Sequence, residues 1–163
     1  GLILGLALLL IGLIGVCASV AHADTKVRVI DGDTLVVDGV TVRIRGIDAP
    51  ELRQTCRDNS GVIYLCGQAA TKALKELVRG KGVSCTPRDR DRYGRSVAQC
   101  YVGDLDLGRA MVQAGWAIAY VRYSREYVPT QAEAQAARSD ASNRHGRRQA
   151  GVRVPSLRAL VAD

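Results

Sequence analysis

Closely spaced carboxylates and arginines interrupt the apolar runs of VRVIDGDTLVVDGVTVRIRGIDAPE, residues 27–51. Carboxylates so near one another are costly to bury unless a cation or hydrogen-bond donors compensate their charge. Hard cations such as Ca²⁺ bind through several carboxylate and carbonyl oxygens and keep some of their waters. The stretch could therefore hold such a cation, although each acid taken alone could equally stand in a solvated turn. The acids concerned are Asp31, Asp33, Asp48 and Glu51.

A second charged segment, PRDRDRYGR at 87–95, carries Arg92, Tyr93 and Arg95. Alone, it is typical of a solvated turn with alternating charges. Phosphodiester cleavage, however, builds negative charge on a five-coordinate phosphorus, and a divalent cation, guanidinium donors and a group that orients water all assist it. Arginine suits this chemistry because its planar fork binds two oxygens at once and stays charged. Together with the acids, these residues favour phosphoryl chemistry.

Composition narrows the choice of mechanism and partner. The 163 residues suit a single domain, and the net charge of +7 fits a polyanion such as nucleic acid as well as it fits ordinary solubility. Only two histidines occur, His22 and His145, so a histidine base, triad or metal ligand is not expected. The cysteines after residue 23 lack the C-x₂-C pairs of a zinc site and indicate two disulfides, with three possible connectivities.

Runs of Val, Ile and Leu predict five strands. Asp38-Gly39 separates the second strand from the third and is typical of a type I′ hairpin turn. From Val40 to Ile47, alternation places Val40, Val42 and Ile44 on one face and Thr41, Arg43 and Arg45 on the other, which is not the core face. We expect strands at 26–31, 34–38, 40–47, 83–87 and 96–102.

Three helices are expected beside these strands. The first covers 67–81, and the second begins at an Asp106 cap and runs through Ala114. For the third, Thr130-x-x-Glu133 offers a capping box before the sequence AEAQAAR. This order of elements predicts an α+β fold, a closed five-stranded barrel of the oligonucleotide-binding (OB) type with the helices packed outside.

The two ends of the chain differ from the middle in composition. Residues 1–23 carry no charge and end in Ala21-His22-Ala23, which is typical of a secretory signal cut before Asp24. A secreted or periplasmic protein is therefore expected, with membrane attachment only if this segment stays uncleaved as an anchor. Residues 24–138 would form the domain, and 139–163 would form a poorly ordered tail rich in Arg, Ser, Asn and Gly.

Three motifs occur in order along the chain: VIDGDT at 29–34, VRIRGIDAPE at 42–51 and DRYGR at 91–95. In residues and spacing they closely resemble the staphylococcal nuclease (thermonuclease) family, and the resemblance runs from about Lys26 to Tyr123. It implies a secreted, calcium-dependent nuclease on an OB-fold barrel that acts on DNA and RNA. Water would attack phosphorus and leave 3′-phosphate products. No protein partner is implied, and we expect a monomer.

The resemblance also implies a role for each matching residue. Arg43 and Arg95 would clamp the phosphate, and Glu51 would orient or deprotonate the attacking water. Asp33 and Asp48 would hold the calcium through their carboxylates. The remaining positions are Ala49, through its backbone carbonyl; Asp31 and Thr34, through water or as supports; Arg92 and Tyr93, at a terminal phosphate; and Tyr120 and Tyr123, in the nucleotide pocket.

Two other classes of protein are consistent with parts of the pattern: an OB-fold binding module without catalysis, and a calcium-binding structural or envelope protein. Arg45 could bind substrate or form a structural pair. Because Cys85 and Cys100 lie on the two strands that flank the charged turn, a cross-strand bond between them is sterically plausible. Cys56 and Cys66 would then close a short loop beside the site, and we predict this connectivity.

Overall fold

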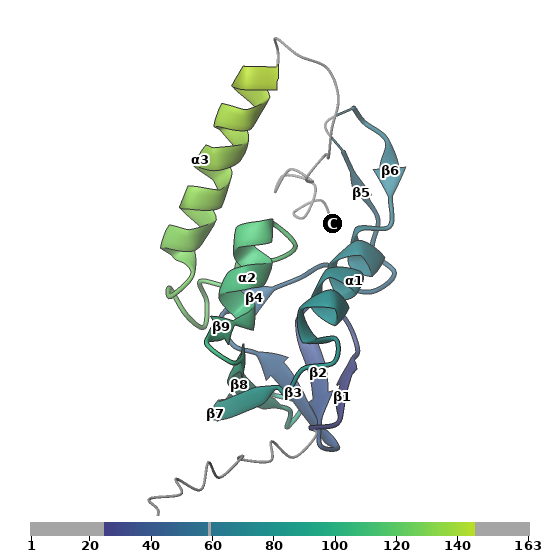
Figure 1. Cartoon of the computed structure of the whole chain (residues 1–163), viewed down its shortest axis with the longest axis vertical. Helices are drawn as coiled ribbons and strands as arrows, with labels where there is room; N and C mark the ends of the chain where they lie inside the picture. Colours follow the sequence, from purple (N-terminus) through teal and green to yellow (C-terminus); the bar gives the residue numbers. More distant parts are fainter. Residues whose placement is uncertain (1–24, 59, 146–163) are drawn as a thin grey trace, which may run out of the picture.

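The computed structural model describes residues 25–58 and 60–145. Its main sheet has the order β1-β2-β3-β8-β7, in which β3 and β8 run parallel and the other neighbours run antiparallel. The sheet curls into a half-barrel (Figure 1). Its strands are β1 (Val27–Val29), β2 (Thr34–Val37), β3 (Val40–Ile44), β7 (Ser84–Arg90) and β8 (Ser96–Val102), with β9 (Leu105–Asp106) paired to β8.

Each of these first five strands overlaps a predicted range, although β1 and β3 are shorter than expected and β7 is longer, and the α+β fold is confirmed. The barrel is not closed by a continuous ladder, however, because β1 and β7 remain the edge strands of the described sheet. Two further pairs of short strands were not predicted, since two-residue strands carry no periodicity. They are β4 (Ile47–Asp48) with β10 (Ile118–Ala119), and β5 (Cys56–Arg57) with β6 (Ile63–Tyr64).

The first two helices, α1 (Cys66–Val78) and α2 (Leu107–Ala114), confirm the expected positions. The Asp106 side chain accepts a hydrogen bond from the Arg109 amide at 3.0 Å and so caps α2 as predicted. Gly115 ends this helix with a φ of 80°, a left-handed conformation that glycine adopts without steric cost.

The third helix, α3 (Val128–His145), is longer at both ends than predicted. The capping box was wrong, because Thr130 lies inside the first turn and its hydroxyl instead accepts a hydrogen bond from Arg109 on α2 at 3.1 Å. Pro129 fits this turn because the first amides of a helix need no intrahelical partner. The helix also continues through residues 139–145, which were expected to belong to the tail.

The two hairpins show how local signals succeed and fail. Asp38 and Gly39 both have positive φ, 49° and 84°, which confirms the type I′ turn. Val40 follows this turn and is exposed, so its expected place on the core face was wrong. In the second hairpin β7 extends to Arg90, and the charged turn shrinks to 91–95.

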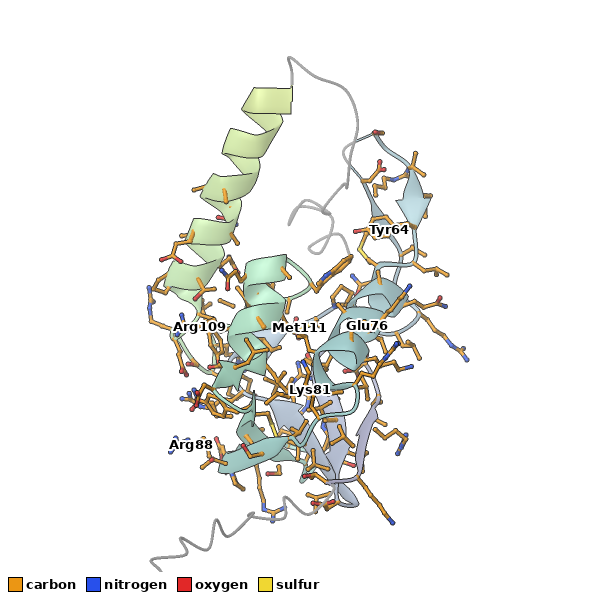
Figure 2. The ribbon with its side chains drawn as sticks, in the orientation of Figure 1. Tyr64, Glu76, Lys81, Arg88, Arg109 and Met111 are labelled. Carbon is orange, nitrogen blue, oxygen red and sulfur yellow. A yellow bond between two sulfur atoms is a disulfide. The ribbon has the colours of Figure 1, made fainter. Side chains whose placement is uncertain are left out.

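The core lies between the sheet and the first two helices, and α3 extends away from it (Figure 1). Met111, labelled on α2 in Figure 2, is fully buried there. The predicted disulfides are both present: Cys85–Cys100 joins β7 to β8, and Cys56–Cys66 ties the β5–β6 hairpin to the start of α1. The other fully buried large side chains include Leu35, Ile44, Ile47, Leu74, Leu107, Val112 and Tyr127.

The expected signal segment, residues 1–23, lies outside the described residues, as does the part of the expected tail from 146 to 163. Within 25–58 and 60–145, no helix has the length and apolar character needed to cross a membrane.

Candidate active site

Arg43 lies on the central strand β3, between β2 and β8. Its Nη2 atom contacts two carboxylates, Asp33 Oδ2 at 3.0 Å and Asp48 Oδ1 at 2.7 Å. Burial acts to lower the pKa of Arg43, but these carboxylates outweigh it and raise the pKa above its usual value. The guanidinium therefore stays charged and is held in one place.

Asp33 is the buried carboxylate of this group, with 4% of the residue exposed. Burial, with a smaller contribution from neighbouring Asp31, raises its pKa to about 7 although Arg43 acts to lower it. The Thr34 hydroxyl donates to Asp33 Oδ1 at 2.9 Å, and the Ala49 amide donates to Oδ2 at 3.2 Å. The Asp33 amide donates to Asp31 Oδ1 at 3.0 Å, and this side-chain hydrogen bond fixes the turn formed by Asp31, Gly32 and Asp33.

Two glycines allow the acidic segments to approach α1 closely. A Cβ atom on Gly32 would lie 2.7 Å from the Ala49 Cβ and 2.9 Å from the Ala70 Cβ. A Cβ atom on Gly67 would overlap the carbonyl oxygen of Glu51 and lie 2.6 Å from its carbonyl carbon. Sequence reasoning missed both roles, because the contacts join segments far apart along the chain.

Glu51 lies on an exposed corner that is fixed by its backbone. Its amide donates to the Gln54 side-chain oxygen at 3.2 Å, and its carbonyl accepts from the Gln54 amide at 2.8 Å. The Gly67 amide donates to the Gln54 carbonyl at 3.2 Å, which ties this turn to the start of α1. The Cys56–Cys66 disulfide closes the following segment at the same place.

Arg95 is held by a residue that the sequence did not single out, Asp91. The Asp91 carboxylate accepts from Arg95 Nε at 2.6 Å, from the Arg95 amide at 2.9 Å and from the Tyr93 amide at 2.9 Å. Partial burial acts to raise the pKa of Asp91, but these hydrogen bonds hold it below its usual value. The only signal in the sequence is the spacing of an Asp four residues before the arginine in a tight turn.

A cavity of about 740 Å³ brings most of the predicted substrate residues together. The guanidinium carbons of Arg92 and Arg95 lie 4.8 and 5.5 Å from the Tyr93 ring centre, within the range of a cation–π contact. The Tyr120 and Tyr123 rings pack at 5.1 Å. The residues of this group that line the cavity are Arg43, Arg92, Tyr93, Arg95, Tyr120 and Tyr123.

The other predicted site residues, Asp31, Asp33, Thr34, Asp48, Ala49 and Glu51, do not line this cavity. Asp33 and Asp48 contact Arg43, which does line it, and Glu51 follows Asp48 on a separate corner of the chain. The two alternatives for Arg45 are also resolved in part: it pairs with Glu126 at 3.1 Å, and Glu126 accepts from Gln99 Nε2 at 2.5 Å. Arg45 thus has a structural partner, although it also lines the cavity.

Asp33 and Asp48 contact the same guanidinium nitrogen of Arg43, so their carboxylates lie close together. Carboxylate oxygens are the ligands that a hard cation such as Ca²⁺ prefers. Within residues 25–58 and 60–145, no three His, Cys, Asp or Glu side chains approach closely enough to hold a metal by themselves. A cation here would therefore need backbone carbonyls and waters as further ligands, which Ca²⁺ accepts.

Comparison with known proteins agrees with this geometry. Residues 41–146 match the family model described as staphylococcal nuclease homologue. An uncharacterized endonuclease of Haemophilus influenzae is 32% identical over 136 residues, which cover 79% of this chain and 71% of that protein. An uncharacterized endonuclease of Escherichia coli O157:H7 is 39% identical over 107 residues, 63% of each chain.

The succinoglycan biosynthesis protein ExoI of Rhizobium meliloti is 39% identical over 95 residues, 57% of this chain and half of its own length. The shared region thus spans between half and about three quarters of these relatives. The residues that match the family model, 41–146, include Arg43, Glu51 and Arg95. With a half-barrel and three helices in its described residues and a family match over most of its length, this chain belongs to the staphylococcal nuclease family.

Proposed function

We propose that this chain is a secreted or periplasmic nuclease that uses Ca²⁺ to hydrolyse phosphodiester bonds in DNA and RNA and leaves 3′-phosphate products. One observation carries the proposal: Arg43 and Arg95, each fixed by carboxylates, line the same cavity. The family and the relatives named as endonucleases support it. The two disulfides support export, because such bonds persist in oxidising compartments.

The two arginines act on the phosphate. Each guanidinium is already oriented, Arg43 by Asp33 and Asp48 and Arg95 by Asp91, so little reorganisation is needed when negative charge builds on the phosphoryl oxygens. Removing one donor of this kind typically lowers kcat by about 10²–10³. Tyr93 stacks against Arg95, and with Tyr120 and Tyr123 it offers aromatic surface to the nucleotide.

The calcium would be held by Asp33 and Asp48, with the Ala49 carbonyl as a further ligand and Asp31 and Thr34 supporting through water. When bound, such an ion stabilises negative charge that develops on the phosphoryl group. The chain itself contributes Glu51, whose carboxylate on the fixed corner orients or deprotonates the attacking water. The water oxygen bonds to phosphorus, the bond from phosphorus to the 5′ oxygen breaks, and the leaving oxygen takes up a proton.

The test measures cleavage of an end-labelled single-stranded oligonucleotide by the mature chain. We expect cleavage with Ca²⁺, none with excess chelator, and a 3′-phosphate on the new end. Arg43→Lys and Arg95→Lys should each lower kcat by about 10²–10³ at unchanged circular dichroism. Arg28→Lys, on the edge strand β1, is the matched control. Full activity of both variants would exclude the clamp, and binding without cleavage by the wild type would favour a non-catalytic binding module.

A further inference from the structure

A β-bulge places Arg88 in β7. Pro87 pairs with Ala98 and Asp89 pairs with the adjacent residue Val97, so Arg88 is the extra residue without a partner in the ladder. A bulge re-aims the side chain of the inserted residue, and bulges are frequent beside active sites. The Cys85–Cys100 disulfide fixes the register on one side of the bulge. Arg88 lines the cavity and lies at the outer edge of the sheet (Figure 2).

The arginines that line the cavity differ in their partners. Arg90 donates to the Gly94 carbonyl and Arg92 lies over the Tyr93 ring, and the other arginines form two groups. Arg43, Arg45 and Arg95 each contact a carboxylate that fixes the guanidinium. The side chains of Arg88 and Arg122 are exposed, and neither forms an ion pair or hydrogen bond within the described part of the chain. The charge of this second group is therefore left for a ligand to neutralise.

Arg122 lies far from Arg88 in the chain, in the turn that follows β10. The turn is placed by the Tyr120 amide, which donates to the Gly46 carbonyl just beyond β3 at 2.9 Å. Arg88 and Arg122 thus come from separate segments of the cavity wall. Of the fixed arginines, Arg43 lies on β3, Arg45 directly follows it, and Arg95 ends the 91–95 turn. A ligand that meets all of them must carry several negative charges along an extended path.

We propose that Arg88 and Arg122 bind backbone phosphates other than the scissile one, so that the cavity takes a polynucleotide strand through at least two further phosphates. This inference rests on the proposed nuclease function. Arg88 and Arg122 are exposed and form no ion pair or hydrogen bond that supports the fold, so the fold does not depend on whether a strand is bound to them. They therefore contribute affinity for longer strands, whereas Arg43 and Arg95 contribute to the chemical step.

The test compares a dodecamer and a dinucleotide as single-stranded substrates for Arg88→Ala/Arg122→Ala. The ratio of kcat/KM for the dodecamer to that for the dinucleotide should fall about tenfold, since each phosphate contact is worth roughly half a log unit of affinity at moderate salt. The slope of log Kd against log salt for the dodecamer should become shallower by about 1.4, or ~0.7 for each lost contact. Arg28→Ala on β1 is the control and should change neither value.

Arg88→Lys/Arg122→Lys should recover most of the dodecamer preference, because a point charge is sufficient for a phosphate contact that needs no fixed fork. An unchanged ratio and an unchanged salt slope in the alanine variant would overturn the proposal. If the wild type cleaves neither substrate, the proposed nuclease function fails, and the salt slope of dodecamer binding still decides whether these two arginines contact phosphates.

Discussion

Replacing Gly67 with alanine should displace Glu51 without altering the side chains of the site. Alanine is favoured over glycine inside a helix by up to about 1 kcal/mol, so α1 itself gains from the change. The added Cβ, however, would overlap the Glu51 carbonyl oxygen and lie 2.6 Å from its carbonyl carbon. Because ordinary contact begins at 3.4 Å, the carbonyl carbon alone would need to retreat by about 0.8 Å, and the overlapping oxygen would need to move further, so the corner shifts by more than about 1 Å.

A displacement of about 1 Å in a group that positions a reactant can lower the rate by about 10². We therefore expect Gly67→Ala to reduce kcat by about that factor. Overpacking costs roughly 1–3 kcal/mol and can cost more where, as here, backbone must shift, and the helical gain offsets only part of this cost, so we expect a folded but clearly less stable protein. Initial rates on a single-stranded oligonucleotide, together with urea unfolding, separate the two effects.

Gly82→Ala is the matched control, since its Cβ would meet only the Thr25 side chain at 3.6 Å, an ordinary contact. A double-mutant cycle with Glu51→Gln then shows whether the loss passes through Glu51. If it does, Gly67→Ala should cause little further loss in the Glu51→Gln background. Wild-type kcat in a folded Gly67→Ala protein would refute the assignment of Glu51 to the reaction or the fixed position of its corner.

Two other changes test the supports of the site. Cys56→Ser/Cys66→Ser should lower the free energy of unfolding by about 2–4 kcal/mol and should also lower kcat, because the disulfide closes the segment after Glu51. Urea unfolding measures the first effect and initial rates measure the second. An unchanged kcat would show that the disulfide is structural only. Asp91→Asn should lower kcat through Arg95. Because hydrogen bonds depress the pKa of Asp91, the pair stabilises the fold above the unfolded value of about 3.9 and is lost as pH falls through the lower folded value. On acidification, the free energy of unfolding of Asp91→Asn should therefore fall less than that of the wild type. Equal losses would show that the Asp91–Arg95 pair does not cause the acid dependence.

The elements that the sequence predicts well are those with local causes. Asp38-Gly39 specifies its turn through two positive φ angles, and Asp106 with Gly115 sets both ends of α2. The strand alternation places Arg43 on the correct face for the same reason, because the period of two needs only the neighbouring residues.

The features that escape prediction depend on distant segments. Thr130 lies inside α3, where its hydroxyl contacts Arg109 on α2, and the short β4–β10 pair joins residues about 70 positions apart along the chain. The close approach at Gly67 is of the same kind, since its sequence signal is only a glycine in the first turn of a helix. The sequence thus predicts the residue types of the site, whereas many of the contacts that position them join distant segments and are not predicted.

The register between β3 and β8 combines a local pattern, the alternation of side chains along a strand, with a contact between distant segments. Val42 pairs with Ser96, and Arg43 pairs with Val97. Arg95 directly precedes β8, so the register sets how close it lies to Arg43. The sequence predicts that both arginines belong to one site but says nothing of this parallel pairing. A slip of one residue would turn the side chains of β3 to the opposite face and send Arg43 into the core. The buried pair Ile44 and Ala98 on the core face therefore does more than stabilise the sheet, because it fixes the two arginines on one cavity.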